Sequence, residues 1–211
     1  MRLVILSDTH SLHGFISAVP DGDVLIHAGD MSLRGTLEEV AGFLDWFGSL
    51  PHSHKLLVAG NHDWLFERRR TVAEGLIPSG TTYLRDSGVS IAGINFWGSP
   101  WQPWFYDWAF NLQRGAEIAA KWALIPNDVH VLITHGPPHG ILDEVVRPPG
   151  KHQGCEALRA RLDSLPDLRL HAFGHIHESY GTLSEGSRRF VNASICDFHY
   201  VPVNAPVVVD V

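Results

Sequence analysis

The sequence predicts an α/β fold, a four-layer α-β-β-α sandwich in which two mixed β-sheets pack face to face and helices cover their outer faces. Two observations predict it. Short apolar segments alternate with segments of helical periodicity from the start of the chain, and the tail after residue 180 carries strand-like segments without helices, which we expect to supply the second sheet. No linker or low-complexity stretch divides the chain, so we expect residues 1–211 to form one domain.

Strands are expected where a short apolar or β-branched run ends at polar or turn-forming residues. The run Leu3–Leu6 is entirely apolar, which is typical of a strand buried on both faces. The expected strands are Leu3–Leu6, Asp23–Ala28, Lys55–Ala59, Thr81–Leu84, Val89–Ala92, Ile94–Trp97, Val129–Thr134, Leu168–Phe173, Tyr180–Leu183, Phe190–Ala193 and Val207–Val211.

Helices are expected where apolar residues recur at spacings of three and four. Leu37, Val40, Phe43, Leu44 and Phe47 share one face in this way. The expected helices are Leu37–Phe47, Trp64–Ala73, Leu112–Leu124 and Gly154–Leu165, and an aromatic loop, Ser99–Trp108, separates the middle strands from the third helix.

Five of the expected strands end in the same small set of polar residues. Any one of these residues alone is more typical of a helix cap or a turn, but capping does not require five strands to end alike. Because the carboxyl ends of parallel strands meet at one edge of a sheet, we expect these side chains to lie together. They are Asp8, His10, Asp30, Asn61, His135, His175 and His177, with His62 beside them.

This set of side chains suits metal ions. Carboxylate, amide and imidazole ligands without thiolate are typical of Mn²⁺, Fe or Zn²⁺ sites, and we expect Mn²⁺. Seven ligands exceed what one octahedral ion uses, whereas two ions sharing a bridging carboxylate would use them all. Two metal ions roughly 3.5–4 Å apart can hold the oxygens of a phosphoryl group during hydrolysis.

Composition narrows the class of protein. With 45% apolar and 18% charged residues, the chain is typical of soluble globular proteins, and neither a signal peptide nor a membrane span is evident. We expect a cytoplasmic protein. The net charge of −7 disfavours long nucleic acids as partners, and the two cysteines form no CxxC pair. The sequence leaves the oligomeric state open.

The order of these motifs resembles that of the calcineurin-like metallophosphoesterases. Asp8-x-His10, Gly29-Asp30, Gly60-Asn61-His62-Asp63, His135 and Gly174-His175-x-His177 span most of the chain. The segments Gly98–Trp104, Thr134–Pro138, Gly174–Glu178 and Val191–Ser194 are similar to the branch called metallophosphoesterase domain-containing proteins. That branch implies metal-dependent phosphodiesterase activity, including activity on cyclic nucleotides.

The resemblance also implies a role for each residue. The first metal ion would be held by Asp8, His10, Asp30 and His177, and the second by Asp30, Asn61, His135 and His175, with Asp30 bridging. A hydroxide between two such ions would attack phosphorus. We expect Asp30 and His62 to be the catalytic residues, His62 by donating a proton to the leaving group or a hydrogen bond to the phosphoryl group.

The chain departs from the wider family after Asp30. Leu33 stands where an acidic residue, which would orient His62, is common. Asp63 is the candidate to replace it. Arg34 falls where related phosphatases keep a phosphate-binding arginine; the alternative is a solvated arginine on a loop.

Substrate contacts are expected from Asn61, His62, Arg34, Trp101, Trp104 and His139. Trp101, Trp104 and Phe105 would stack against a nucleobase, or alternatively cover the edge of the sheets. His139 lies close enough to His135 in sequence to reach a substrate.

The leading hypothesis is therefore a dinuclear-metal phosphodiesterase that acts on small phosphodiesters, with nucleotides among the candidate substrates. A phosphomonoesterase or a nuclease with the same metal centre is the alternative. The alternative of another class is a catalytically weak scaffold that binds partners, for which a missing ligand would be the signature; every expected ligand is present here.

Overall fold

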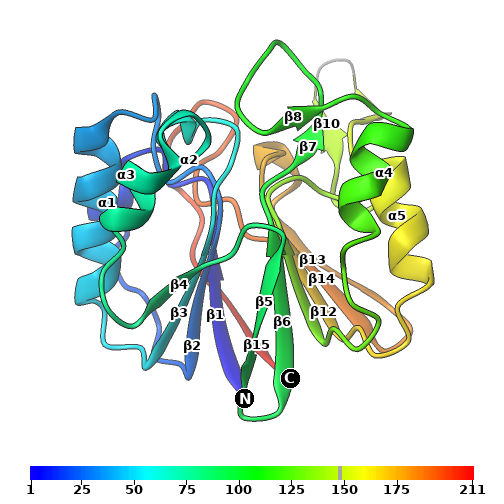
Figure 1. Cartoon of the computed structure of the whole chain (residues 1–211), viewed down its shortest axis with the longest axis horizontal. Helices are drawn as coiled ribbons and strands as arrows, with labels where there is room; N and C mark the ends of the chain where they lie inside the picture. Colours follow the sequence, from blue (N-terminus) through cyan, green and yellow to red (C-terminus); the bar gives the residue numbers. More distant parts are fainter. Residues whose placement is uncertain (147–148) are drawn as a thin grey trace.

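A computed structural model describes residues 1–146 and 149–211. Two large sheets pack against each other, with α1 (Leu37–Ser49), α2 (Trp64–Arg68) and α3 (Arg70–Gly75) outside one sheet, and α4 (Ala116–Trp122) and α5 (Glu156–Asp163) outside the other (Figure 1). The predicted four-layer fold is confirmed. No helix in the described ranges is long and apolar enough to cross a membrane.

The first sheet has five strands in the order β15-β1-β2-β3-β4. They are β1 (Arg2–Leu6), β2 (Val24–Ala28), β3 (His54–Val58), β4 (Thr81–Tyr83) and β15 (Val207–Asp210). The four strands β1 to β4 run parallel, and β15 pairs antiparallel with β1. The carboxyl ends of β1, β2 and β3 therefore lie at one edge.

The second sheet has six strands in the order β13-β14-β12-β9-β6-β5. They are β5 (Ser87–Ile91), β6 (Ile94–Ser99), β9 (Val131–Thr134), β12 (Leu170–Phe173), β13 (Gly181–Glu185) and β14 (Arg188–Asn192). Its central strands β6, β9, β12 and β14 are parallel to one another.

Short elements complete the chain: β7 (Gln102–Pro103) pairs with β8 (Asn111–Leu112), and β10 (Glu144–Val145) pairs with β11 (Lys151–His152). Two 3₁₀ turns, η1 (His13–Phe15) and η2 (His177–Ser179), follow β1 and β12.

Alternation along β1 explains why its segment Leu3–Leu6 is apolar throughout. Leu3 and Ile5 belong to the core between the sheets, whereas Val4 and Leu6 belong to a second core beneath α1. A third core lies beneath α4 and α5, where Trp122 and Leu158 meet Leu132 of β9. Each sheet thus buries both of its faces, and most of the buried polar side chains lie at or beyond the strand ends.

The two sheets join at the edge where β1 ends. Ser7 forms an isolated parallel bridge with Ser194, beyond the end of β14. The Ser7 N–H donates to the Ala193 carbonyl at 2.9 Å, and the Ile195 N–H donates to the Ser7 carbonyl at 2.8 Å. These bonds hold the loop after β1 against the loop after β14.

Several predicted boundaries were wrong. The helix predicted over Trp64–Ala73 is two short helices that meet at Arg69, whose φ of −134° is not helical. The helix predicted from Leu112 begins at Ala116, because Gly115 has φ +88° and Leu112 pairs in β8. The tail supplies β13 and β14 to the second sheet as expected, but β15 joins the first.

Candidate metal centre

The seven predicted ligands and His62 converge at the joined edge of the sheets. The first sheet presents Asp8, His10, Asp30 and Asn61 after its strands β1, β2 and β3, and the second presents His135, His175 and His177 after β9 and β12. Six of the seven are buried and His175 is half-buried. The sequence spacing thus becomes a spatial cluster.

Asp30 lies at the centre of this cluster. Its Oδ1 accepts a hydrogen bond from the His62 backbone N–H at 2.8 Å. Its Oδ2 lies 3.3 Å from His135 Nε2, 3.9 Å from His10 Nε2 and 4.0 Å from His62 Nε2. Burial would raise the pKa of Asp30, but the facing histidines outweigh burial and hold it well below its ordinary value. The carboxylate is therefore charged.

Asp8, His10 and His177 form what we call the first donor group. His177 Nε2 lies 3.1 Å from His10 Nε2 and 3.4 Å from Asp8 Oδ1. The Asp197 carbonyl, 2.9 Å from His177 Nδ1, accepts the ring proton and so directs Nε2 toward its neighbours. The Ser194 hydroxyl donates to Asp8 Oδ2 at 2.9 Å and fixes that carboxylate.

Asp30, His135 and His175 form the second donor group. The Ala28 carbonyl accepts the Nδ1 proton of His135 at 3.0 Å, which leaves Nε2 to face Asn61 Oδ1 at 2.9 Å. Burial opposes protonation of His135, but the charge of Asp30 outweighs it and raises its pKa to about 9. An ion bound at His135 would displace that proton.

These arrangements fit divalent metal ions. Within each donor group, and also among His10, Asp30 and His62, the three donor atoms lie within 4.8 Å of one another. Imidazole nitrogens 3.1 Å apart beside a buried carboxylate are metal-type donors aimed at a common point. The cluster fits a dinuclear centre, and the division of ligands between two ions stays a prediction.

The backbone at the cluster is strained. Asp8, His10, Asp30 and His175 have φ of 52°, 43°, 55° and 70°, in the left-handed region that residues with a Cβ seldom adopt. Such strain, on the order of 1–3 kcal/mol for each residue, persists only where the surrounding structure enforces it. A Cβ at Gly60 would collide with Asp30 Oδ1, and one at Gly174 with Asp8 Oδ2. The glycines of both motifs therefore let the backbone approach the carboxylates.

The Asp63 carboxylate holds the loop that contains Asp30; it is not the group that holds the His62 ring. Its carboxylate accepts hydrogen bonds from the N–H groups of Gly60 at 2.7 Å, Asp30 at 2.9 Å and Ser32 at 3.1 Å. Burial and the charge of Asp30 raise the pKa of Asp63 to about 6, against the stabilising bonds from Ser32 and Gly60.

The prediction that Asp63 orients His62 is not supported by this geometry. Instead, the backbone carbonyl of Leu33 lies 2.7 Å from His62 Nδ1 and orients the ring by accepting its hydrogen bond. The ring of Trp108 covers the same histidine, with centroids 4.3 Å apart. Leu33 thus supplies from its backbone the acceptor that its side chain lacks.

Two buried histidines support the loops from inside the strands. His27 Nε2 lies 3.1 Å from Thr9 Oγ1, and His171 Nε2 lies 2.8 Å from Thr134 Oγ1. Because the Thr134 hydroxyl donates to the Gly136 carbonyl, it accepts from His171, whose proton is therefore on Nε2. Burial lowers the pKa of each histidine to about 3, so both are neutral.

Of the predicted aromatic substrate contacts, Trp104 lies in the same cavity as His175 of the second donor group. It lines a cavity of about 480 Å³ that reaches His175. Phe105 meets His175 edge to face, with centroids 5.7 Å apart. The remaining lining residues are Pro103, Tyr106, Arg114, Val145, Lys151, Gln153 and Ile176.

The structure does not bring Trp101 or His139 to the donors. The Trp101 indole donates to Asp86 Oδ2 at 2.9 Å, and its ring packs against both outer cores, which matches the alternative that it covers the sheets. His139 faces Asp143, with Nδ1 3.8 Å from Oδ2. Arg34 is exposed on the loop after Asp30, and its role stays a prediction.

Three residues near the donors escaped the sequence analysis: Trp108, Ser194 and Tyr200. Ser194 belongs to the Val191–Ser194 motif, so its position after a strand was an available signal. Tyr200 has its ring centroid 4.8 Å from that of His10. It follows no strand, so no signal in the sequence pointed to it.

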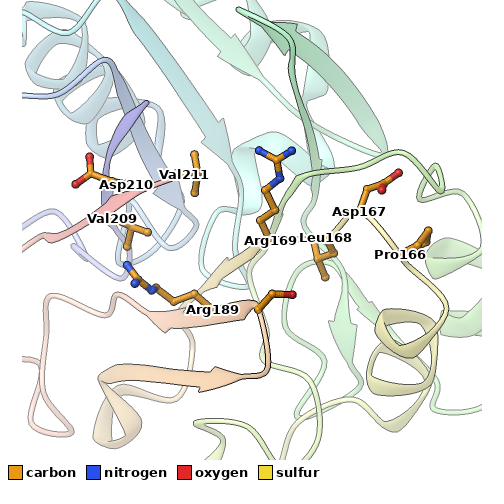
Figure 2. Close-up of a pocket in the computed structure, with 9 residues that line it drawn as sticks. Pro166, Asp167, Leu168, Arg169, Arg189, Val209, Asp210 and Val211 are labelled. Atoms are coloured by element: carbon orange, nitrogen blue, oxygen red, sulfur yellow. The ribbon is translucent and has the colours of Figure 1, made fainter.

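A second cavity, of about 460 Å³, lies at the opposite edge of the sheets (Figure 2). Arg169 and Arg189 line it from the second sheet, and Val209 to Val211 line it from the end of the chain. Asp210 pairs with Arg2 at the start of β1, whereas the donors follow its end. This cavity is therefore separate from the metal centre.

Comparison with known proteins decides the family. The profile of the calcineurin-like phosphoesterases matches residues 1–179. The chain belongs to this family. It is also 44% identical to human metallophosphoesterase domain-containing protein 1, an alignment that covers 99% of this chain and 70% of the relative. The branch predicted from the sequence motifs is thereby confirmed.

Solved structures of other proteins share the fold of this chain. The crystal structure of TT1561 of Thermus thermophilus aligns with a TM-score of 0.60 at 15% identity, over 90% of this chain and 88% of that one. A putative 5′-nucleotidase from Staphylococcus aureus aligns with a TM-score of 0.59 at 11% identity, over 99% of this chain and 53% of that one. Membership of the calcineurin-like phosphoesterases supports metal-dependent hydrolysis of phosphoesters.

Replacing Asp30 tests the centre of the cluster. Asp30→Ala removes the carboxylate common to both sets of donors, so we expect loss of bound metal and a fall in turnover of at least about a thousandfold. Metal content by mass spectrometry and turnover of an aryl phosphoester measure the two effects. Asp45→Ala, at an exposed position on α1, is the control. Turnover at the parental rate in Asp30→Ala would refute the assignment.

The buried neutral histidines predict a loss of stability in acid. The folded-state pKa of His171 lies below its ordinary value of 6.5, so the unfolded chain gains a proton first as the pH falls. The contribution of His171 to the free energy of unfolding is therefore present above about pH 6.5 and declines below it, by about 2 kcal/mol between about pH 7 and about pH 5.

Urea unfolding at the two pH values, at constant metal concentration, measures this contribution. His171→Gln keeps a hydrogen-bond donor for Thr134 but does not titrate, so its stability should fall by about 2 kcal/mol less than that of the parent. His54→Gln, at an exposed position, should behave as the parent does. Equal falls in His171→Gln and the parent would contradict the prediction.

Proposed function

We propose that the protein is a dinuclear-metal phosphodiesterase that hydrolyses small phosphodiesters. The observation that carries the proposal is the position of Asp30 Oδ2, 3.9 Å from His10 Nε2 of the first donor group and 3.3 Å from His135 Nε2 of the second, beside an aromatic cavity that reaches His175. Two divalent ions, with Mn²⁺ favoured over Fe or Zn²⁺, would activate water and neutralise charge on the phosphoryl oxygens. The two donor groups would hold these ions, and Asp30, which belongs to the second group and faces His10 of the first, would be shared between them.

The residues of the chain have separate tasks in this proposal. His62 faces Asp30 Oδ2 through Nε2, and its ring is held from behind by the Leu33 carbonyl. A protonated Nε2 would donate to the leaving group or to a phosphoryl oxygen. The Asn61 amide lies where it can contact both His135 and a phosphoryl group.

The cavity favours diesters over monoesters. A monoester carries two negative charges and one organic substituent on its phosphoryl group, whereas a diester carries one negative charge and two organic substituents that each need a surface to lie on. Trp104, Phe105 and Tyr106 offer such a surface next to His175. Trp104 is 47% exposed, with its indole N–H bonded to Asp107 at 2.8 Å, so one ring face can receive a planar group. Nucleotides are among the candidates.

A panel of substrates tests the proposal directly. The Mn²⁺-loaded protein is compared on 2′,3′- and 3′,5′-cyclic nucleotides, aryl phosphodiesters and the matching monoesters. We expect kcat/KM to be at least about tenfold higher for diesters, because a diester has a second organic substituent through which the protein can bind the transition state. A preference for monoesters would instead support a phosphomonoesterase, and no turnover of any ester would support a binding scaffold.

Trp104 is expected to affect the choice of substrate. Trp104→Ala should raise KM for aryl and nucleotide diesters by about tenfold, because stacking on an aromatic ring contributes on the order of 1–3 kcal/mol. Dimethyl phosphate binding and metal content should stay the same. Trp104→Phe keeps an aromatic ring, so its KM should rise less than that of Trp104→Ala. Leu124→Ala, at an exposed position outside the cavity, is the control. An unchanged KM in Trp104→Ala would exclude the contact.

A further inference from the structure

Tyr200 covers the first donor group on its solvent side. Its ring centroid lies 4.8 Å from that of His10, 5.1 Å from that of His177 and 6.2 Å from that of His62. His10 and His177 are 2% and 9% exposed, whereas Tyr200 is 43% exposed. Its ring therefore stands between these donors and solvent, where a bound phosphoester would meet it.

The loop holds Tyr200 in an unfavourable conformation. Its φ of 60° is unusual for a bulky side chain. Asp197 closes the turn: its Oδ1 accepts from the N–H groups of His199 and Val201, both at 2.9 Å, and its carbonyl accepts from the Tyr200 N–H at 2.9 Å. The same carbonyl binds His177, so the ring of Tyr200 is placed relative to the donors by the turn that orients one of them.

Aromatic side chains thus flank both donor groups. Phe105, in the cavity with Trp104, lies against His175 of the second donor group. Tyr200 lies against His10 and His177 of the first. A phosphodiester has two organic substituents on one phosphorus, and a phosphoryl group between the donor groups would direct one toward each aromatic surface.

We propose that Tyr200 is a substrate-contact residue that determines specificity, because one organic substituent of the diester lies against its ring. This proposal rests on the proposed phosphodiesterase function. It assigns the Trp104–Phe105 cavity to one substituent and Tyr200 to the other. A monoester has no group to place against Tyr200.

The test compares Tyr200→Ala and Tyr200→Phe with the parent, all loaded with Mn²⁺. For bis(p-nitrophenyl) phosphate, Tyr200→Ala should lower kcat/KM about tenfold, mainly through KM, because a stacking surface is lost. For p-nitrophenyl phosphate the loss should stay below about threefold, and Tyr200→Phe should remain within about threefold on both. Phe198→Ala removes an exposed aromatic ring from the same loop and should change neither.

Metal content and ligand binding distinguish contact of Tyr200 with the substrate from structural support of His10 and His177 by Tyr200. Bound metal in Tyr200→Ala should equal that of the parent, and the calorimetric Kd of diphenylphosphinate, which has two aromatic substituents and no ester bond, should weaken about tenfold. Equal losses on both substrates, or loss of metal, would show that Tyr200 acts only through the histidines and would overturn the proposal.

Failure of the proposed function has a different signature. If the parent hydrolyses monoesters only, the phosphodiesterase assignment fails whatever the variants do. The binding of diphenylphosphinate then still decides the role of Tyr200: weaker binding in Tyr200→Ala supports the contact, and unchanged binding refutes it.

Discussion

A buried carboxylate, that of Asp30, is the group on which the rest of the site depends. It is 2% exposed, and an isolated charge at such a position would be strongly unfavourable. Three imidazole nitrogens within 4.0 Å offset that cost. Its position also requires a left-handed backbone, which the carboxylate of Asp63 secures through the N–H groups around it. Two acidic residues are therefore buried together, one facing the donors and one binding the backbone beneath them.

The donors are shared between the sheets, which couples the metal centre to the packing of the fold. The first donor group joins Asp8 and His10 of the first sheet to His177 of the second, and the second donor group joins Asp30 to His135 and His175. Separation of the sheets would pull both groups apart. The Ser7–Ser194 bridge and the bond from the Ser194 hydroxyl to Asp8 hold this junction. Binding of metal ions should therefore stabilise the contact between the sheets as well as equip the site.

The sequence predicted the parts of the site that follow strands. An apolar run such as Leu3–Leu6 marks a buried strand, and a polar residue at its end marks the sheet edge, so the candidate ligands were recognisable together, from the recurrence of this pattern over five strands. Tyr200 was not, because a loop closed by Asp197 places it, and no periodicity describes such a loop. The partner of His62 was hidden for another reason: every residue has a backbone carbonyl, so that of Leu33 leaves no trace in the sequence. The strand Val207–Asp210 was recognised but assigned to the wrong sheet, since pairing depends on the path of the chain rather than on composition.

In the segment from Gly60 to Asp63, each of four consecutive residues has a different structural role at the site. Gly60 leaves room for the Asp30 carboxylate, and its N–H binds Asp63. Asn61 presents its amide oxygen to His135, while the backbone N–H of His62 binds Asp30 and its ring faces the same carboxylate. A shift of one residue would place the amide, the imidazole and the second carboxylate in the wrong positions at once. The spacing of the motif is therefore set by the need to place, within one tight turn of backbone, an amide beside His135, an imidazole beside the Asp30 carboxylate and a second carboxylate on the Asp30 N–H, and this explains why four consecutive residues carry so much of the information about function.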